Sequence, residues 1–255
     1  MRVLTLTVMT FLAGVSSVHA FEDVLRTHGG FWNWRAYHTM RYDVVGWPFS
    51  PDPRSREAET VDLETRRIRI DGGGARSPYH LGFDGRSTWV RPSFGAVHAP
   101  SRFYALVPFQ LIGMPFVLGE AGVRQEDLGY RVFDGRLYEV FAFHLPAGAD
   151  TPADTFVAYV DDDTRLLHMV TFDFTYPALA DRGGGPSPAC AVVFDEWQNV
   201  SGLTVPRTLS FHDWVNGRLG ATRASFSVEN VAFDQAAVVP SAFADPGEEN
   251  SLPLN

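Results

Sequence analysis

The sequence contains no lysine. All 21 of its basic residues are arginine, against 30 acidic residues, which gives a formal net charge of −9 at pH 7. The lack of lysine excludes a P-loop phosphate site, Schiff-base catalysis and a Ser-Lys dyad. The acidic balance argues against nucleic acid and anionic lipid headgroups as partners, because both are bound by basic patches.

Cys190 is the single cysteine of the chain, so no intramolecular disulfide can form. It begins an apolar strand pattern and has no adjacent basic residue in the sequence. We therefore expect a buried structural thiol rather than a reactive one.

The usual motifs of catalytic and metal sites are also missing. There is no G-x-S-x-G turn of a serine hydrolase, and the histidines share no metal-ligand spacing. The run Asp161–Asp163 lacks the glycine and the closing glutamate of a calcium loop, so we interpret it as a hairpin turn. Asp195 and Glu196, with Asp213 in the next strand, could form an acid–base pair, but carboxylates are abundant on an acidic protein. We expect no metal, no cofactor and no catalytic residue. The histidines that follow the first 20 residues are His28, His38, His80, His98, His144, His168 and His212.

The start of the chain has the pattern of a cleaved secretory signal. Arg2 is followed by an apolar stretch from Val3 to Val15, and Val18-His19-Ala20 places small or neutral residues where a signal peptidase reads. A lipidated signal would need a cysteine at this point. We expect removal of residues 1–20 and a periplasmic or secreted location.

The remaining length suits one domain with a sizeable core, which we place at residues 21–244. The segment 245–255 is polar and contains proline, so we expect a flexible tail.

Alternation of apolar and polar residues predicts strands over most of the chain, separated by turn residues such as Asp84-Gly85 and Asp134-Gly135. Several of these strands are apolar on both faces, and such a sheet must be covered on both sides. The predicted strands are residues 38–47, 57–70, 78–83, 87–91, 128–133, 136–145, 155–160, 165–176, 190–199, 203–214 and 218–232.

Two segments break the strand pattern. Residues 21–37 have apolar side chains at helical spacing, interrupted by Gly29-Gly30, which predicts a helix with a break. Phe103 to Gly119 is the most apolar stretch of the mature chain, but it is shorter than the about 20 uninterrupted residues of a membrane span. Pro108 fits the first turn of a helix and Pro115 ends it, so we expect two short helical pieces.

Several stretches resemble LolA/LolB-like periplasmic lipoprotein carriers. FDEWQNVSGLTVPRTLSFHDW (194–214) contains the v-x-G-l-x-x-P turn of that group, and YVDDDTRLLHMVTF (159–172) contains its D-x-x-T-x-l hairpin. SFSVENVAFDQAAVVPSAFADP (225–246) is similar to its closing strand. Thr27-His28-Gly29-Gly30 and the MPFVL segment, Met114 to Leu118, resemble a set of uncharacterised exported proteins of this kind.

This resemblance covers most of the mature chain and implies a mainly β, α+β fold. The expected architecture is an incomplete barrel of about eleven antiparallel strands whose apolar concave side is covered by short helices. In the family, this cavity accepts lipoprotein acyl chains or other lipids, and an acyl chain gains about 0.8 kcal/mol per buried methylene. The resemblance places Phe103 to Gly119 as the lid over the sheet.

We expect a non-catalytic, monomeric protein that binds or carries a lipid, an acyl chain or another hydrophobic ligand, with at most transient membrane contact. The alternatives are an exported hydrolase-like enzyme that uses His or carboxylate residues in the same cavity, and an envelope protein–protein interaction module. Convergent His, Asp or Glu side chains in the cavity would favour the enzyme, and an apolar lining would favour the carrier. The expected ligand contacts are Phe103, Tyr104, Phe109, Met114 and Phe116 on the lid, and Trp89, Phe141, Phe143 and Phe172 on the facing sheet.

Overall fold

The structure is a computed structural model. The expected signal peptide before Ser17, the end of the strand predicted at 165–176, and the tail after Gly247 lie outside the residues that it describes. The described residues are 17–52, 54–75, 77–146, 155–172 and 189–247, without the side chains of 17–20.

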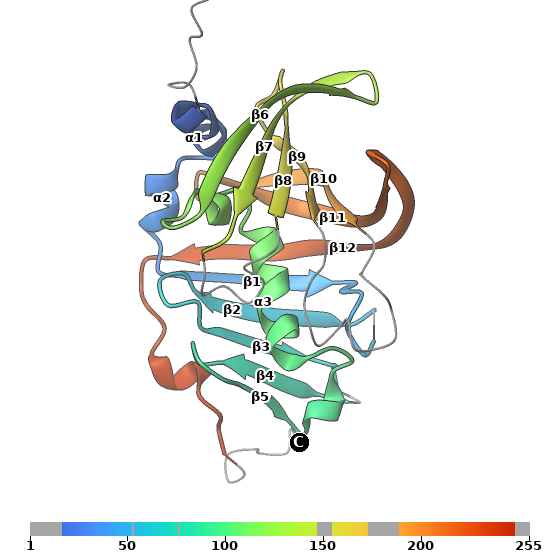
Figure 1. Ribbon diagram of the computed structural model, residues 1–255. Helices are drawn as coiled ribbons and strands as arrows, with labels where there is room; N and C mark the ends of the chain where they lie inside the picture. Colours follow the sequence, from blue (N-terminus) through green and yellow to red (C-terminus); the bar gives the residue numbers. More distant parts are fainter. Residues whose placement is uncertain (1–16, 53, 76, 147–154, 173–188, 248–255) are drawn as a thin grey trace, which may run out of the picture.

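Twelve strands of the described residues form one antiparallel sheet in the order β5-β4-β3-β2-β1-β12-β11-β10-β9-β8-β7-β6. Two meanders, β1 to β5 and β6 to β12, join where β1 pairs with β12. The sheet is strongly curved and ends at β5 and β6 without closing, which confirms the expected incomplete barrel (Figure 1). The strands are β1 (Thr39–Val45), β2 (Arg56–Asp62), β3 (Ile68–Gly72), β4 (Tyr79–Phe83), β5 (Thr88–Arg91), β6 (Arg124–Phe133), β7 (Arg136–His144), β8 (Thr155–Asp161), β9 (Leu167–Phe172), β10 (Cys190–Val200), β11 (Leu203–Val215) and β12 (Arg218–Asp234).

The twelve strands agree with the about eleven expected, and the difference is that the strand predicted at 57–70 is two strands, β2 and β3. A turn separates them: the Asp62 carboxylate accepts hydrogen bonds from the backbone N–H groups of Glu64 and Thr65. Arg66 follows with a positive φ of 60°. A short polar side chain that caps its own turn is a frequent way to reverse a strand.

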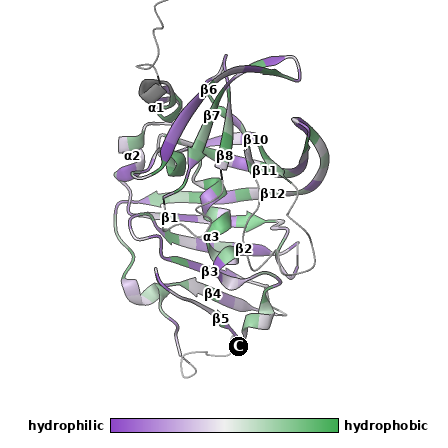
Figure 2. Ribbon diagram, viewed as in Figure 1, coloured by the Kyte–Doolittle hydropathy of each residue, from purple (hydrophilic) through white to green (hydrophobic). Residues whose placement is uncertain are grey.

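The helices α1, α2, α3 and η2 lie against the inner face of the sheet (Figure 1). The long helix α3 contacts β3, β4 and β5, whereas α1 contacts β6, and α1 and α2 both contact η2. Colouring by hydropathy shows α3 mostly hydrophobic and the edge strand β6 mostly hydrophilic (Figure 2). The helices are α1 (Ser17–Thr27), α2 (Phe31–Arg35), η1 (Phe94–Ala96), α3 (Ser101–Ile112), η2 (Phe116–Gly119) and η3 (Pro240–Phe243).

The predicted lid is helical, but Pro108 does not begin a helix as expected. It lies inside α3, and Pro115 separates α3 from η2. A proline inside a helix costs about 3 kcal/mol. Buried residues on both sides of it, such as Tyr104 and Leu111, supply packing that offsets this cost. Within the described part of the chain, no helix has the length and apolarity needed to cross a membrane.

The strands that are apolar on both faces take part in two clusters. Phe141 and Phe143 of β7 point into the main core under the helices. On the other face, Tyr138 and Val140 belong to a second, smaller cluster with residues of β8, β9 and β10. The long β6–β7 and β11–β12 hairpins reach this cluster, where Phe133 and Trp214 have ring centroids 5.8 Å apart. The sheet therefore covers part of its second apolar face with its own hairpins.

The break between α1 and α2 is an anchor to the sheet. His28 Nδ1 donates to the carbonyl oxygen of Thr204 (3.0 Å), and His28 Nε2 accepts from the backbone N–H of Leu167 (3.2 Å). The ring is fully buried, and burial lowers the pKa of His28 to about 4. Gly29 follows with φ 107° and Gly30 with φ 91°. The His-Gly-Gly segment thus joins the helices to β9 and β11.

We expect Gly29→Ala to destabilise the protein more than Gly30→Ala. Both positions have a backbone conformation that suits glycine, which costs another residue about 1–3 kcal/mol. A Cβ at Gly29 would also overlap the carbonyl oxygen of Gly202, whereas nothing lies within 4 Å of a Cβ at Gly30. Urea unfolding of the two variants measures the difference, and equal losses of unfolding free energy would contradict the anchor.

Candidate functional site

All the predicted ligand contacts except Trp89 lie in the main core. Each of them is at most 6% exposed. The side chains that were expected to line a cavity therefore pack against one another and against the helices. They are Phe103, Tyr104, Phe109, Met114, Phe116, Phe141, Phe143 and Phe172.

Trp89 has a different position from the one expected. Its neighbour in β5, Val90, belongs to the main core, so Trp89 points to the opposite face of the sheet. Its indole N–H donates to the carbonyl oxygen of Phe243 (2.9 Å), and the Arg69 guanidinium lies 5.8 Å from its ring. Trp89 thus binds the C-terminal segment through Phe243, and its side chain does not lie in the space under the lid.

The lid and the sheet residues also have separate partners. Phe141 and Phe143 contact Phe21 of α1, at centroid distances of 5.5 and 4.6 Å. Phe116 stacks on Trp34 of α2 at 4.7 Å with an interplanar angle of 7°. The cover over the sheet is therefore shared by α1, α2 and the predicted lid segment. The sequence predicted a cover of short helices, but it named ligand contacts of that cover in the lid segment alone.

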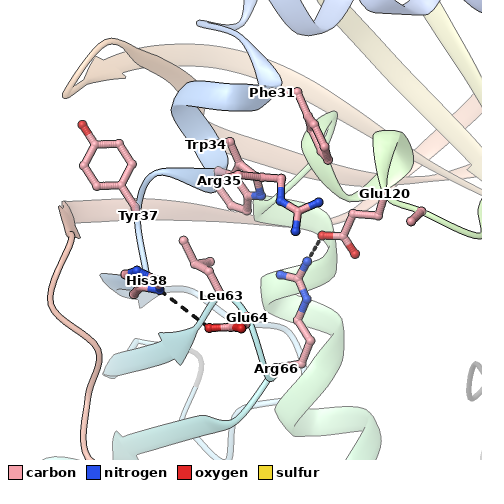
Figure 3. A pocket seen from close by; sticks show the side chains of 10 residues that line it. Phe31, Trp34, Arg35, Tyr37, His38, Leu63, Glu64, Arg66 and Glu120 are labelled. Atoms are coloured by element: carbon pink, nitrogen blue, oxygen red, sulfur yellow. Dashed lines mark ion pairs between the residues drawn. The ribbon is translucent and has the colours of Figure 1, made fainter.

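A pocket of about 440 Å³ opens where these helices meet the edge of the core (Figure 3). Its floor is aromatic: Trp34 lines it and stacks in turn on Phe109 and Phe116. This volume is within the range of small-molecule sites. The lining residues are Phe31, Trp34, Arg35, Tyr37, His38, Leu63, Glu64, Arg66, Glu120 and Ala121.

The rim of the pocket is charged. Arg66, on the turn between β2 and β3, forms an ion pair with Glu120, which directly follows η2 (Figure 3). The guanidinium also lies 4.9 Å from the ring of Phe109, and burial lowers the pKa of Arg66 to about 10. On the other side, His38 Nδ1 lies 3.8 Å from a Glu64 oxygen. The pocket thus has an aromatic floor and a polar rim that includes the Arg66–Glu120 ion pair, a combination that suits an amphipathic molecule.

A set of polar residues also lies inside the core, and the sequence did not predict it. Glu57 and Glu59 of β2 are 0% and 1% exposed. Tyr104 of α3 donates to Glu57 Oε1 and Tyr42 of β1 donates to Glu59 Oε2, both at 2.7 Å. The Tyr79 hydroxyl lies 2.9 Å from that of Tyr104, to which it donates. We call these five residues the carboxyl–tyrosine cluster.

Each carboxyl group of the cluster has one oxygen without a partner, although the Tyr79 and Ser50 hydroxyls also lie near Glu57 and act to lower its pKa. Glu57 Oε2 and Glu59 Oε1 are buried and have no hydrogen-bond partner. Among the described residues, no arginine or histidine forms an ion pair with either group. Burial raises the pKa of Glu57, and burial together with the nearby Glu57 charge raises the pKa of Glu59 well above its ordinary value.

Other candidate residues lie away from the pocket. Asp195 and His212 both contact the Ser210 hydroxyl, at 2.6 and 3.0 Å, but Phe194 and Leu209, not these residues, belong to the core. This network is therefore on the opposite face of the sheet. No group of three or more potential metal ligands occurs in the described part of the chain. Burial raises the pKa of Cys190 to about 11, which makes its thiol unreactive.

Comparisons with known proteins give matches to solved structures alone. No family model matches the chain, and neither does any curated protein. A LolA superfamily protein from Nitrosomonas europaea is similar at 10% identity and a TM-score of 0.48, with 91% of this chain and 99% of that chain covered. A DUF1329 family protein from Desulfovibrio piger is similar at 10% identity and a TM-score of 0.43, with 90% and 98% covered.

We expect Glu59→Gln to remove a pH dependence of stability. The raised pKa means that folded Glu59 keeps a proton which the unfolded chain releases above its ordinary pKa of 4.5. The wild type therefore loses stability as the pH rises above 4.5, by up to about 1.4 kcal/mol per pH unit, until the pH passes the folded pKa. Glutamine keeps an acceptor for Tyr42 and carries no charge. Urea unfolding between pH 5 and pH 8 should show the variant gaining on the wild type.

The matched control is Glu126→Gln on the edge strand β6, where the side chain is 55% exposed. Its stability relative to the wild type should change little over the same range of pH. A Glu59→Gln variant whose relative stability did not rise with pH would contradict the burial of a protonated carboxyl at this position.

Proposed function

We propose that the protein is an exported, non-catalytic carrier or binding protein for a hydrophobic or amphipathic ligand, such as a lipid or an acyl chain. The ligand lies between the helices and the curved sheet and enters at the pocket. The apolar stretch at the start of the sequence and the cleavage pattern after it support export, to the periplasm or out of the cell.

The observation that carries this proposal is the aromatic floor of the pocket. Trp34, Phe109 and Phe116 form one stack that begins at the pocket and continues into the core. All three belong to helices rather than to the sheet. A shift of α2 or η2 would therefore enlarge the pocket along an apolar path without breaking the hydrogen bonds between strands. Such a path needs little polar chemistry to hold an alkyl chain.

We expect Ala121→Trp to weaken binding of an uncharged fluorescent probe such as N-phenylnaphthylamine by about tenfold or more, because the new ring fills the pocket. Ala121 lines the pocket and is exposed, so this change leaves the core intact. A fluorescence titration of purified protein measures the dissociation constant.

Ala221→Trp is the matched control, because Ala221 is also exposed but lies on β12, outside the lining of the pocket. It should bind the probe as the wild type does. Absence of probe binding by the wild type would refute the carrier function, and equal binding by the two tryptophan variants would refute the pocket as the place of access.

The buried carboxyl groups give the enzyme alternative one supporting observation. Glu57 and Glu59 converge inside the core, as a general acid and its partner would. Water reaches neither group, however, since both are at most 1% exposed, and Tyr42 and Tyr104 occupy one oxygen of each. Hydrolysis of ester or glycoside substrates that stops in Glu57→Gln would favour the enzyme over the carrier.

A further inference from the structure

The carboxyl–tyrosine cluster has more hydrogen-bond acceptors than donors, even with the proton that Glu59 keeps. All three tyrosine hydroxyls are used: Tyr42 and Tyr104 donate to the carboxyl groups, and Tyr79 donates to Tyr104. What remains are two buried carboxyl oxygens, one on Glu57 and one on Glu59, without a partner. A group that fits both must bring hydrogen-bond donors.

The cluster also lacks a positive charge. Buried carboxylates in proteins are normally paired with a cation or hydrogen-bonded at both oxygens, because an unpaired buried ion costs several kcal/mol. The chain has many arginines, yet within the described residues none pairs with Glu57 or Glu59. The rings of Tyr42, Tyr79 and Tyr104 add aromatic faces, which attract cations. The site is thus complementary to a cationic donor.

The cluster and the pocket lie along one strand. Inward-facing residues of β2 alternate as Glu57, Glu59 and Val61, and Leu63 follows at the pocket. At about 3.3 Å per residue, Glu59 lies about 13 Å along the strand from Leu63. An extended amphipathic molecule could therefore place its polar end at the carboxyl groups and its apolar end toward the aromatic floor of the pocket.

From this arrangement we infer that Glu57 and Glu59 bind the ammonium group of an amphipathic amine and select it over ligands with an anionic head. This inference rests on the proposed carrier function and specifies its ligand class. On binding, Glu59 releases its proton to solvent, and the ammonium donates to the two free carboxyl oxygens and supplies the positive charge that the core lacks. An anionic head would meet two acidic groups with no donor to receive it.

Competition between probes of equal chain length tests the inference. Dodecylamine and dodecanoic acid are each titrated against the bound, uncharged N-phenylnaphthylamine. We expect half-displacement by dodecylamine at a concentration about tenfold or more below that of dodecanoic acid. In the double variant Glu57→Gln, Glu59→Gln this preference should disappear, while the uncharged probe still binds.

The acidic surface of the protein could attract any amine, so the control is Glu126→Gln, which removes an exposed charge from β6. That variant should keep the preference for the amine. Should the double variant fail to fold, Glu59→Gln alone, which retains an acceptor for Tyr42, should reduce the preference.

The outcomes separate the two proposals. Equal displacement by the amine and the acid, or a preference that survives in the glutamine variants, overturns the assignment of the ammonium site while the carrier function stands. Failure of the uncharged probe to bind the wild type overturns both.

Discussion

The inner face of the curved sheet is apolar, and the fold depends on covering it. A twelve-stranded antiparallel sheet that does not close leaves this face without a second sheet to pack against. Helices that lie outside the strand order, α1 at one end and α3 at the other, do the covering. Besides side-chain packing, three polar contacts hold the cover: His28 at the break between α1 and α2, Tyr104 of α3 with Glu57, and the Arg66–Glu120 ion pair beside η2.

The sheet and the helices are held together in different ways, and this difference bears on where we propose that a ligand binds. Hydrogen bonds between strands fix the sheet, whereas the helices are held mainly by side-chain packing. The aromatic stack of Trp34, Phe109 and Phe116 belongs to the helices and reaches the surface at the pocket. The main core is otherwise filled by its own side chains, so a larger ligand must displace helices rather than occupy a preformed channel. The carboxyl–tyrosine cluster, farther along β2 from the pocket, is where we propose that the interior recognises the head group of a ligand.

Much of the fold could be predicted from local patterns. Turn residues such as Asp134-Gly135 and Asp161 located the hairpins, and the Asp161 carboxylate does cap its turn by accepting from Thr164. Gly29-Gly30 located the break between the first helices. Pro108 was misjudged because packing of α3 outweighs the local preference of proline, a balance that no local pattern contains.

The candidate site was harder to predict. In the segment R-E-A-E-T-V-D, strand alternation places Glu57, Glu59 and Val61 on the same face. The two charged residues indicate that this face lies toward solvent, whereas Val61 indicates that it lies inward. Val61 does face inward, but Glu57 and Glu59 share its phase and are buried with it. The position of Val61 on the same face was the available indication that the two glutamates are buried. Their partners Tyr42, Tyr79 and Tyr104 come from distant parts of the sequence, so only the folded chain brings them together. The predicted position of Trp89 was wrong because an aromatic residue can pack on either face of a sheet, and Trp89 lies on the face opposite the main core.

We propose that, in the cell, the space between the helices and the sheet holds a hydrophobic or amphipathic ligand. Native mass spectrometry of protein purified from the cell envelope, followed by solvent extraction, tests this most directly. We expect a peak at a mass above that of the mature chain, which returns to the mass of the chain on gentle activation as the ligand dissociates. We also expect an amphipathic molecule in the extract. A single peak at the mass of the mature chain, with no hydrophobic molecule in the extract beyond that of a control protein, would contradict it.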